Sequence, residues 1–167
     1  MEPYKEILES ASWVVITDVG EGHGSLDLVA DAHSLPFRDQ LFDFVLAIEV
    51  FEHLRCPSRA AAEIYRVLKP GGKAVVTIPF MFHVHGDPYD FQRLTGSGLE
   101  ELFVEFFSVD VQPFGGRVHV ISDIVSTTWR PLATLRCINW LLMLPFFDQT
   151  SVDCPSGYYV SLSKSLL

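Results

Sequence analysis

The sequence predicts an α/β fold built around a parallel β-sheet. Two short apolar runs, Phe42–Ile48 and residues 74–78, are rich in β-branched residues and too short to be buried helices. Such runs are typical of strands that are buried on both faces, as they are in parallel sheets. Between the two runs, apolar residues recur at the helical spacing i, i+3, i+4, i+7: Ala61, Ile64, Tyr65 and Leu68. Strand, helix and strand together predict a right-handed crossover unit.

The ends of the predicted helix carry their own signals. Pro57 suits the first turn, where the missing N–H is not needed, and Pro70-Gly71-Gly72 is expected to end the helix. Two further strands, at residues 13–18 and 26–31, are expected before this unit, behind a short opening helix with an apolar face. That face consists of Tyr4, Ile7, Leu8 and Ala11.

Polar residues follow both central strands, where parallel sheets bind their ligands. The first strand is followed by Glu49, Glu52 and His53, and the second by His83, His85 and Asp87. Because carboxyl ends of parallel strands share one edge of the sheet, this edge is the candidate functional site. Glu52 is expected to be a first-turn residue that packs on the sheet, and His53 can have either that structural role or a functional one.

The second half of the chain predicts a loop, two helical regions and two strands. Prolines, glycines and aromatic residues over positions 79–95 indicate a loop. Ser97 and Glu100 have the spacing of a capping box for a following helix. Alternating apolar residues then predict two strands with one buried face each, one with Phe107, Val109 and Val111 and one with Tyr158, Val160 and Leu162. Between these strands, residues 118–147 read as an apolar helical insertion that Pro131 divides.

Composition limits the class of protein. The chain has 167 residues, enough for one domain with a real core, and its 49% hydrophobic content excludes a disordered chain. A net charge of −9 with only 12 Lys and Arg argues against a nucleic-acid partner. The three cysteines, Cys56, Cys137 and Cys154, are scattered, which is typical of reduced thiols in a cytoplasmic protein.

No membrane-spanning segment is expected. The first ten residues are charged and have no apolar signal core. The most apolar stretch, residues 132–147, is interrupted by Arg136, Asn139 and Pro145 and is therefore a poor membrane span. We accordingly expect a cytoplasmic protein.

Four motifs occur in a fixed order along the central region: DAHSLPF, FDFVLAIEVFEHL, EIYRVLKPGG and VVTIPF. This series, over residues 13–112, resembles the middle of class I S-adenosylmethionine-dependent methyltransferases, and the ubiquinone/menaquinone-biosynthesis type is the nearest large group. The resemblance implies a three-layer, Rossmann-like methyltransferase sheet that is mostly parallel. It also implies methyl transfer from S-adenosylmethionine to a small-molecule or lipid-like acceptor.

The resemblance assigns roles to particular residues. Asp18 takes the place of the acid that holds the ribose hydroxyls, Asp31 and Ala32 take the place of the pair at the adenine, and Glu49 lines the methionine end. His53 and His85 are the candidate catalytic residues, since a histidine with a near-neutral pKa can act as a base. A third group is expected to close over the acceptor: His83, Asp87, Asp90 and Arg93. Asp90 and Arg93, three positions apart, can equally form a structural ion pair.

The glycine-rich stretch GEGHG, residues 20–24, allows two interpretations. It copies the cofactor loop of the family, yet only six residues separate Gly24 from Asp31, too few for the helix and strand that follow that loop. A connection between the family's second and third strands fits this length better. On that interpretation the family's first strand and its glycine loop are missing, so the fold is expected to be N-terminally truncated.

Two other functions compete with methyl transfer. A degenerate methyltransferase-like domain would act through association, and the apolar region 118–147 is a candidate surface for a homo-oligomer. A metal-dependent hydrolase is suggested by His83-x-His85-x-Asp87, which copies the HxHxDH start of metallo-β-lactamase-fold enzymes. Because Pro88 replaces the last histidine of that motif, we expect no metal site there.

Overall fold

The computed structural model describes residues 9–20, 26–86, 89–128 and 152–166. Its strands are β1 Thr17–Asp18, β2 Leu28–Val29, β3 Phe42–Ile48, β4 Leu68–Pro79, β5 Ser108–Phe114 and β6 Gly157–Ser163. Its helices are the 3₁₀ turn η1 Phe51–His53, α2 Pro57–Val67, α3 Gly96–Leu102 and α4 Arg117–Thr128.

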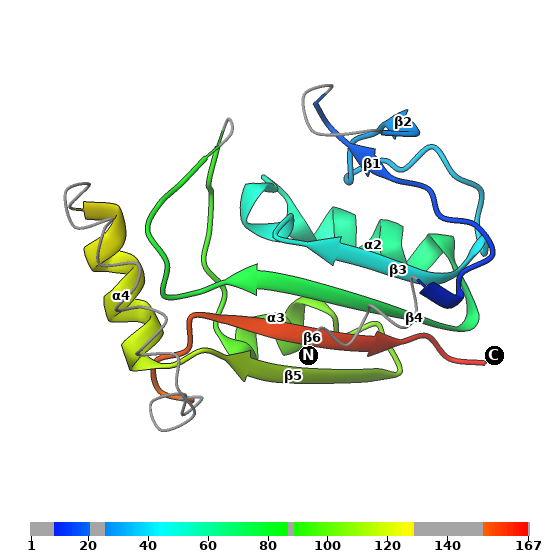
Figure 1. The fold of residues 1–167 in the computed structure, drawn as a ribbon. Helices are drawn as coiled ribbons and strands as arrows, with labels where there is room; N and C mark the ends of the chain where they lie inside the picture. Colours follow the sequence, from blue (N-terminus) through cyan, green and yellow to red (C-terminus); the bar gives the residue numbers. More distant parts are fainter. Residues whose placement is uncertain (1–8, 21–25, 87–88, 129–151, 167) are drawn as a thin grey trace.

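The larger sheet has four strands in the order β3-β4-β6-β5 (Figure 1). β3 and β4 are parallel, whereas β6 is antiparallel to both of its neighbours. β3, β4 and β5 therefore run in one direction, which confirms the mostly parallel Rossmann-like sheet. The register pairs Ile48 with Thr77, so the residues after β3 emerge beside the end of β4.

β1 and β2 form a separate parallel pair with Thr17 opposite Leu28 and Asp18 opposite Val29. Figure 1 shows this pair beyond β3, at the edge of the larger sheet. Both strands are much shorter than predicted. Within the described residues no strand pairs with the free side of β3, so the β-structure is divided into two sheets. Residues 21–24 of the GEGHG stretch lie outside the described residues, and the N-terminal truncation remains a prediction.

The central helix begins where the sequence predicts and ends earlier. Pro57 occupies the first turn of α2. The prediction that Pro70-Gly71-Gly72 ends the helix was wrong, because α2 ends at Val67 and these residues already belong to β4. Leu68 is extended and pairs with Phe42, and a register shift follows before the regular ladder begins. Gly71, with φ +74°, provides the left-handed residue that this irregular stretch needs.

One face of the larger sheet carries the described core. η1, α2 and α3 pack there, with the Phe51 and Phe103 rings edge to face at 5.3 Å and the Tyr65 and Phe106 rings at 5.2 Å. The side chains that become fully buried include Leu68, Val76, Ile78, Leu99, Phe103 and Val160.

The predicted capping box was wrong. Thr95 is the N-cap of α3, since its Oγ1 accepts a hydrogen bond from the N–H of Gly98 at 3.2 Å. The cap therefore lies two residues before Ser97. Phe107, predicted to face inward, precedes β5 and is 79% exposed.

The loop predicted at positions 79–95 is confirmed, because residues 80–86 and 89–95 contain no helix or strand. Helix α4 confirms the beginning of the apolar helical region, while residues 129–151 lie outside the described part. Most of the predicted opening helix also lies outside it, in residues 1–8. None of the helices in the described part is long and apolar enough to cross a membrane.

Candidate functional site

Glu49 directly follows β3 and has a backbone conformation that non-glycine residues rarely adopt. Its φ is +51°, in the left-handed region that costs a non-glycine residue free energy. Thr77 at the end of β4 holds it there: the Thr77 hydroxyl donates to Glu49 Oε1 at 2.8 Å, and the Glu49 N–H donates to the Thr77 carbonyl at 3.1 Å. The Glu49 carboxylate is therefore fixed at the sheet edge.

The loop after β4 returns to clamp the η1 turn. The Phe91 N–H donates to the Glu52 carbonyl at 2.8 Å, and the Gln92 side-chain amide donates to the carbonyl of Phe51 at 2.9 Å. His53 Nδ1 lies 2.6 Å from the Tyr89 carbonyl. A carbonyl only accepts, so Nδ1 carries the proton and Nε2 of a neutral His53 keeps its lone pair.

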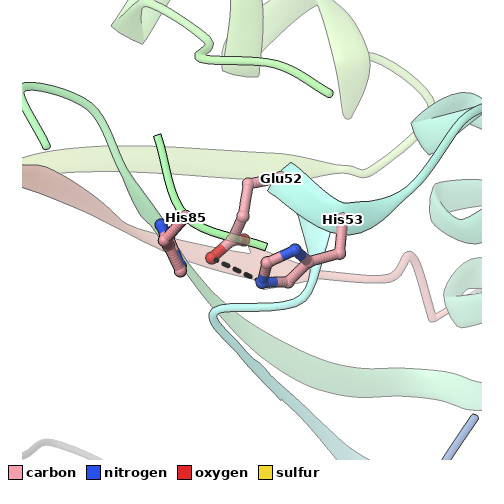
Figure 2. A group of neighbouring side chains, drawn as sticks. All are labelled: Glu52, His53 and His85. Atoms are coloured by element: carbon pink, nitrogen blue, oxygen red, sulfur yellow. Dashed lines mark ion pairs between the residues drawn. The ribbon is translucent and has the colours of Figure 1, made fainter. Parts of the chain in front are cut away.

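Glu52, His53 and His85 point toward one another from η1 and from the loop after β4 (Figure 2). One ligand atom of each lies within 4.8 Å of the other two. The Glu52 side chain is fully buried, and within the described part of the chain neither carboxylate oxygen has a hydrogen-bond partner; His53 Nε2 is 3.6 Å from Oε1. Burial raises the pKa of Glu52, and the charge of Glu49 raises it further.

His85 is held by its own loop. Its backbone N–H donates to Asp90 Oδ2 at 2.9 Å, and its Nδ1 lies 3.3 Å from the His83 carbonyl and 3.4 Å from Asp90 Oδ2. Arg93 donates to both Asp90 oxygens and to the His83 carbonyl, and this pairing lowers the pKa of the buried Asp90. Asp90 and Arg93 thus form the structural ion pair that the sequence left open.

Asp18 is the last residue of β1, and Asp31 lies two residues beyond the end of the neighbouring parallel strand β2. Each carboxylate shapes its own turn: Asp18 Oδ1 accepts from the Gly20 N–H at 3.1 Å, and Asp31 Oδ1 accepts from the His33 N–H at 2.8 Å. Hydrogen bonds from His33, including one from its ring at 2.6 Å, lower the pKa of Asp31. His33 Nε2 in turn accepts from the Cys56 N–H at 3.2 Å, which ties this turn to the start of α2.

The segment after Asp31 is fastened to α2 by Arg66. Its guanidinium donates to both Glu63 oxygens at 2.8 Å, to the Leu35 carbonyl at 3.0 Å and to the Phe37 carbonyl at 2.7 Å. The Leu35 N–H donates to Glu63 Oε2 at 2.7 Å. The chain that carries Asp31 and Ala32 is therefore anchored to the core helix.

The structure divides the predicted site residues into groups. It brings His53 and His85 together, with Glu49 three residues before the buried Glu52. His83 is on the same loop as His85 but exposed and outside the cluster, and Asp87 lies outside the described residues. Sequence reasoning missed Thr77 and Gln92. Neither a hydroxyl in an apolar strand nor an amide in a loop shows from sequence which group it will hydrogen-bond, here Glu49 and the Phe51 carbonyl.

Residues 14–76 match the family described as "Methyltransferase domain". The ubiquinone/menaquinone biosynthesis C-methyltransferase of Ruegeria sp. is 32% identical over 91 residues, which is 54% of this chain and 31% of that protein. The chain thus spans about a third of the length of the curated relatives it matches.

Two solved structures show the fold. The structure of the PH0226 protein of Pyrococcus horikoshii aligns with 97% of this chain over 76% of the PH0226 chain, with a TM-score of 0.58 and 16% identity. The second is phosphoethanolamine N-methyltransferase 2 of Haemonchus contortus in complex with S-adenosyl-L-methionine. It aligns with 82% of this chain over 36% of the enzyme's chain, with a TM-score of 0.51 and 20% identity. By the match over residues 14–76 and by its fold, the chain is similar to class I S-adenosylmethionine-dependent methyltransferases, which confirms the resemblance in its motifs.

Proposed function

We propose that this chain binds S-adenosylmethionine at the carboxyl ends of β1, β2 and β3 and transfers its methyl group to a small-molecule or lipid-like acceptor. The observation that carries the proposal is the parallel register of β1 and β2. It sets Asp18 opposite Val29, so Asp31 follows two residues later at the same end of the strand pair. Similarity to methyltransferases over residues 14–76 supports the same assignment.

The carboxylates fit a nucleoside. The hydrogen bonds from His33 lower the pKa of Asp31, and an ionised carboxylate offers about four acceptor positions. Among the described residues, the turns of Asp18 and Asp31 use Oδ1 of each carboxylate, and Oδ2 has capacity for hydroxyl or amino donors of a ligand. We assign the ribose hydroxyls to Asp18 and the adenine to Asp31 and Ala32.

Glu49, His53 and His85 lie at the other end of the proposed site. S-adenosylmethionine, when bound, supplies an electrophilic methyl group. Thr77 fixes the Glu49 carboxylate, which can accept hydrogen bonds from the amino group at the methionine end. His53 presents an Nε2 lone pair that a proton or a metal ion can use. Methyl transfer depends mainly on orientation, so fixed side chains are the contribution it requires of the protein.

The acceptor is expected near the loop after β4. We assign contact with it to the exposed His83 and to Asp87. Asp90 and Arg93 are paired with each other, so we assign them an indirect role: they hold the loop in the shape that contacts the acceptor. Asp90→Asn should therefore alter acceptor binding by loosening the loop, with cofactor affinity retained.

Calorimetric titration with S-adenosylmethionine and its demethylated product tests the proposal. We expect micromolar binding, and a loss of about tenfold or more in Asp18→Asn and in Asp31→Asn, because each removes a charged acceptor while keeping Oδ1 for its turn. Asp43→Asn is the matched control, since Asp43 is near the opposite end of β3, with an 83% exposed side chain paired to Lys69. Folded protein that binds neither compound, or an equal loss in Asp43→Asn, would contradict it.

A further inference from the structure

We propose that Glu52, His53 and His85 bind one divalent first-row transition-metal ion. The three side chains come from the η1 turn and from the loop after β4, and Figure 2 shows them as neighbours, with Glu52 beside His53. Their ligand atoms lie within 4.8 Å of one another, a spacing at which a single ion between them can bind all three after small side-chain adjustments.

The Glu52 carboxylate is the strongest reason for a ligand. It is fully buried, and both oxygens lack a hydrogen-bond partner among the residues that the structure describes. An unpaired buried carboxylate is destabilising, and native proteins rarely keep one without a partner, a proton or an ion. His53 Nε2 lies 3.6 Å from Oε1, which is too far for a hydrogen bond. A cation at the centre of the cluster would balance the negative charge of this carboxylate and give its oxygens a partner.

The two histidines are held as metal ligands usually are. A ligating histidine donates its other ring N–H to a carbonyl or a carboxylate, which orients the ring and fixes the tautomer. His53 Nδ1 does so to the Tyr89 carbonyl at 2.6 Å. His85 Nδ1 lies 3.3 Å from the His83 carbonyl and 3.4 Å from the Asp90 carboxylate. Both Nε2 atoms therefore keep lone pairs for a cation.

The donor set selects the kind of ion. Two imidazoles and one carboxylate suit Zn²⁺, Mn²⁺, Fe²⁺ or Co²⁺, whereas Mg²⁺ and Ca²⁺ prefer oxygen ligands alone. Three protein donors also leave at least one coordination position open, as in catalytic metal sites. His53 and His85 then act as ligands, and a small oxygen-bearing molecule can complete the coordination. The proposal does not require S-adenosylmethionine binding.

The test is a titration of chelator-treated full chain with Zn²⁺, Mn²⁺, Co²⁺ and Mg²⁺ by calorimetry, with visible absorption for Co²⁺. We expect one ion per chain and weaker binding of Mg²⁺ than of the other three. Glu52→Gln, which keeps the shape of the side chain, should abolish stoichiometric binding. Asp90→Asn should weaken it by about 10–100-fold, since it alters the group behind His85.

His83→Gln is the matched control, because His83 is two residues from His85 on the same loop but outside the cluster. It should bind as the unmodified chain does. If Glu52→Gln fails to fold, His85→Gln replaces it, since the His85 side chain is 34% exposed. Absence of binding by folded protein would overturn the proposal, and so would unchanged affinity in the cluster variant or an equal loss in His83→Gln. Because these titrations contain no nucleoside, their failure is distinct from failure of the proposed methyl transfer.

Discussion

Arg66→Met should destabilise the fold by about 3 kcal/mol. The guanidinium makes a two-point ion pair with the partly buried Glu63, and two hydrogen bonds to the carbonyls of Leu35 and Phe37. Each of these three interactions contributes about 1 kcal/mol at a side chain that is 31% exposed. The further bond to Asp39 adds little, because that carboxylate is 72% exposed.

Urea unfolding and thermal melting of the two proteins measure this difference. For a chain of this length, 3 kcal/mol corresponds to a fall in Tm of about 6–12 °C. Arg66→Lys is the informative control, since lysine keeps the charge but lacks the planar group that reaches several acceptors, and it should recover less than half of the loss. A change in Arg66→Met below about 0.5 kcal/mol would refute the view that this residue anchors the segment after Asp31 to α2.

Three further predictions follow from individual hydrogen bonds. The hydrogen bond from Arg66 lowers the pKa of Glu63, so the stability from this pair is fully present above the unfolded carboxyl pKa of about 4.3 and is lost as pH falls through the lower folded-state pKa. The gap between the urea midpoints of the parent chain and Arg66→Met should therefore narrow by about a third at acid pH, because the bonds to the Leu35 and Phe37 carbonyls do not depend on Glu63, and a constant gap would contradict this. Thr77→Val should weaken cofactor binding about tenfold in calorimetry by freeing Glu49, whereas Thr77→Ser should not, and equal affinities would exclude this role. Thr95→Ala should lower the free energy of unfolding by about 1 kcal/mol through loss of the α3 cap, with Thr95→Ser nearly neutral, and an unchanged urea midpoint would argue against the cap.

The central crossover unit could be predicted from sequence because its signals are local. β-Branched runs define β3 and the end of β4, and Pro57 with a periodic apolar face defines α2. The start of β4 could not be predicted in this way. Leu68 fits the apolar face of the helix equally well, and only its pairing with Phe42, 26 positions earlier, draws it into the sheet.

The site was predictable as a region and not as a set of contacts. Strand ends located Glu49, His53 and His85, since parallel strands direct their carboxyl ends to one edge. The importance of Glu52 was hidden, because its full burial arises when residues 89–93 fold back over η1 through Gln92 and Phe91. The Thr95 cap was hidden for a similar reason, because Ser97 and Glu100 offer an equally good local pattern.

A crystal structure of the chain with the demethylated cofactor product tests the central claim most directly. We predict the nucleoside at the carboxyl ends of β1 and β2, with the ribose hydroxyls within hydrogen-bond distance of the Asp18 carboxylate and the adenine beside Asp31 and Ala32. A nucleoside bound elsewhere, or none bound at saturating concentration, would contradict the assignment of this strand pair as the cofactor site.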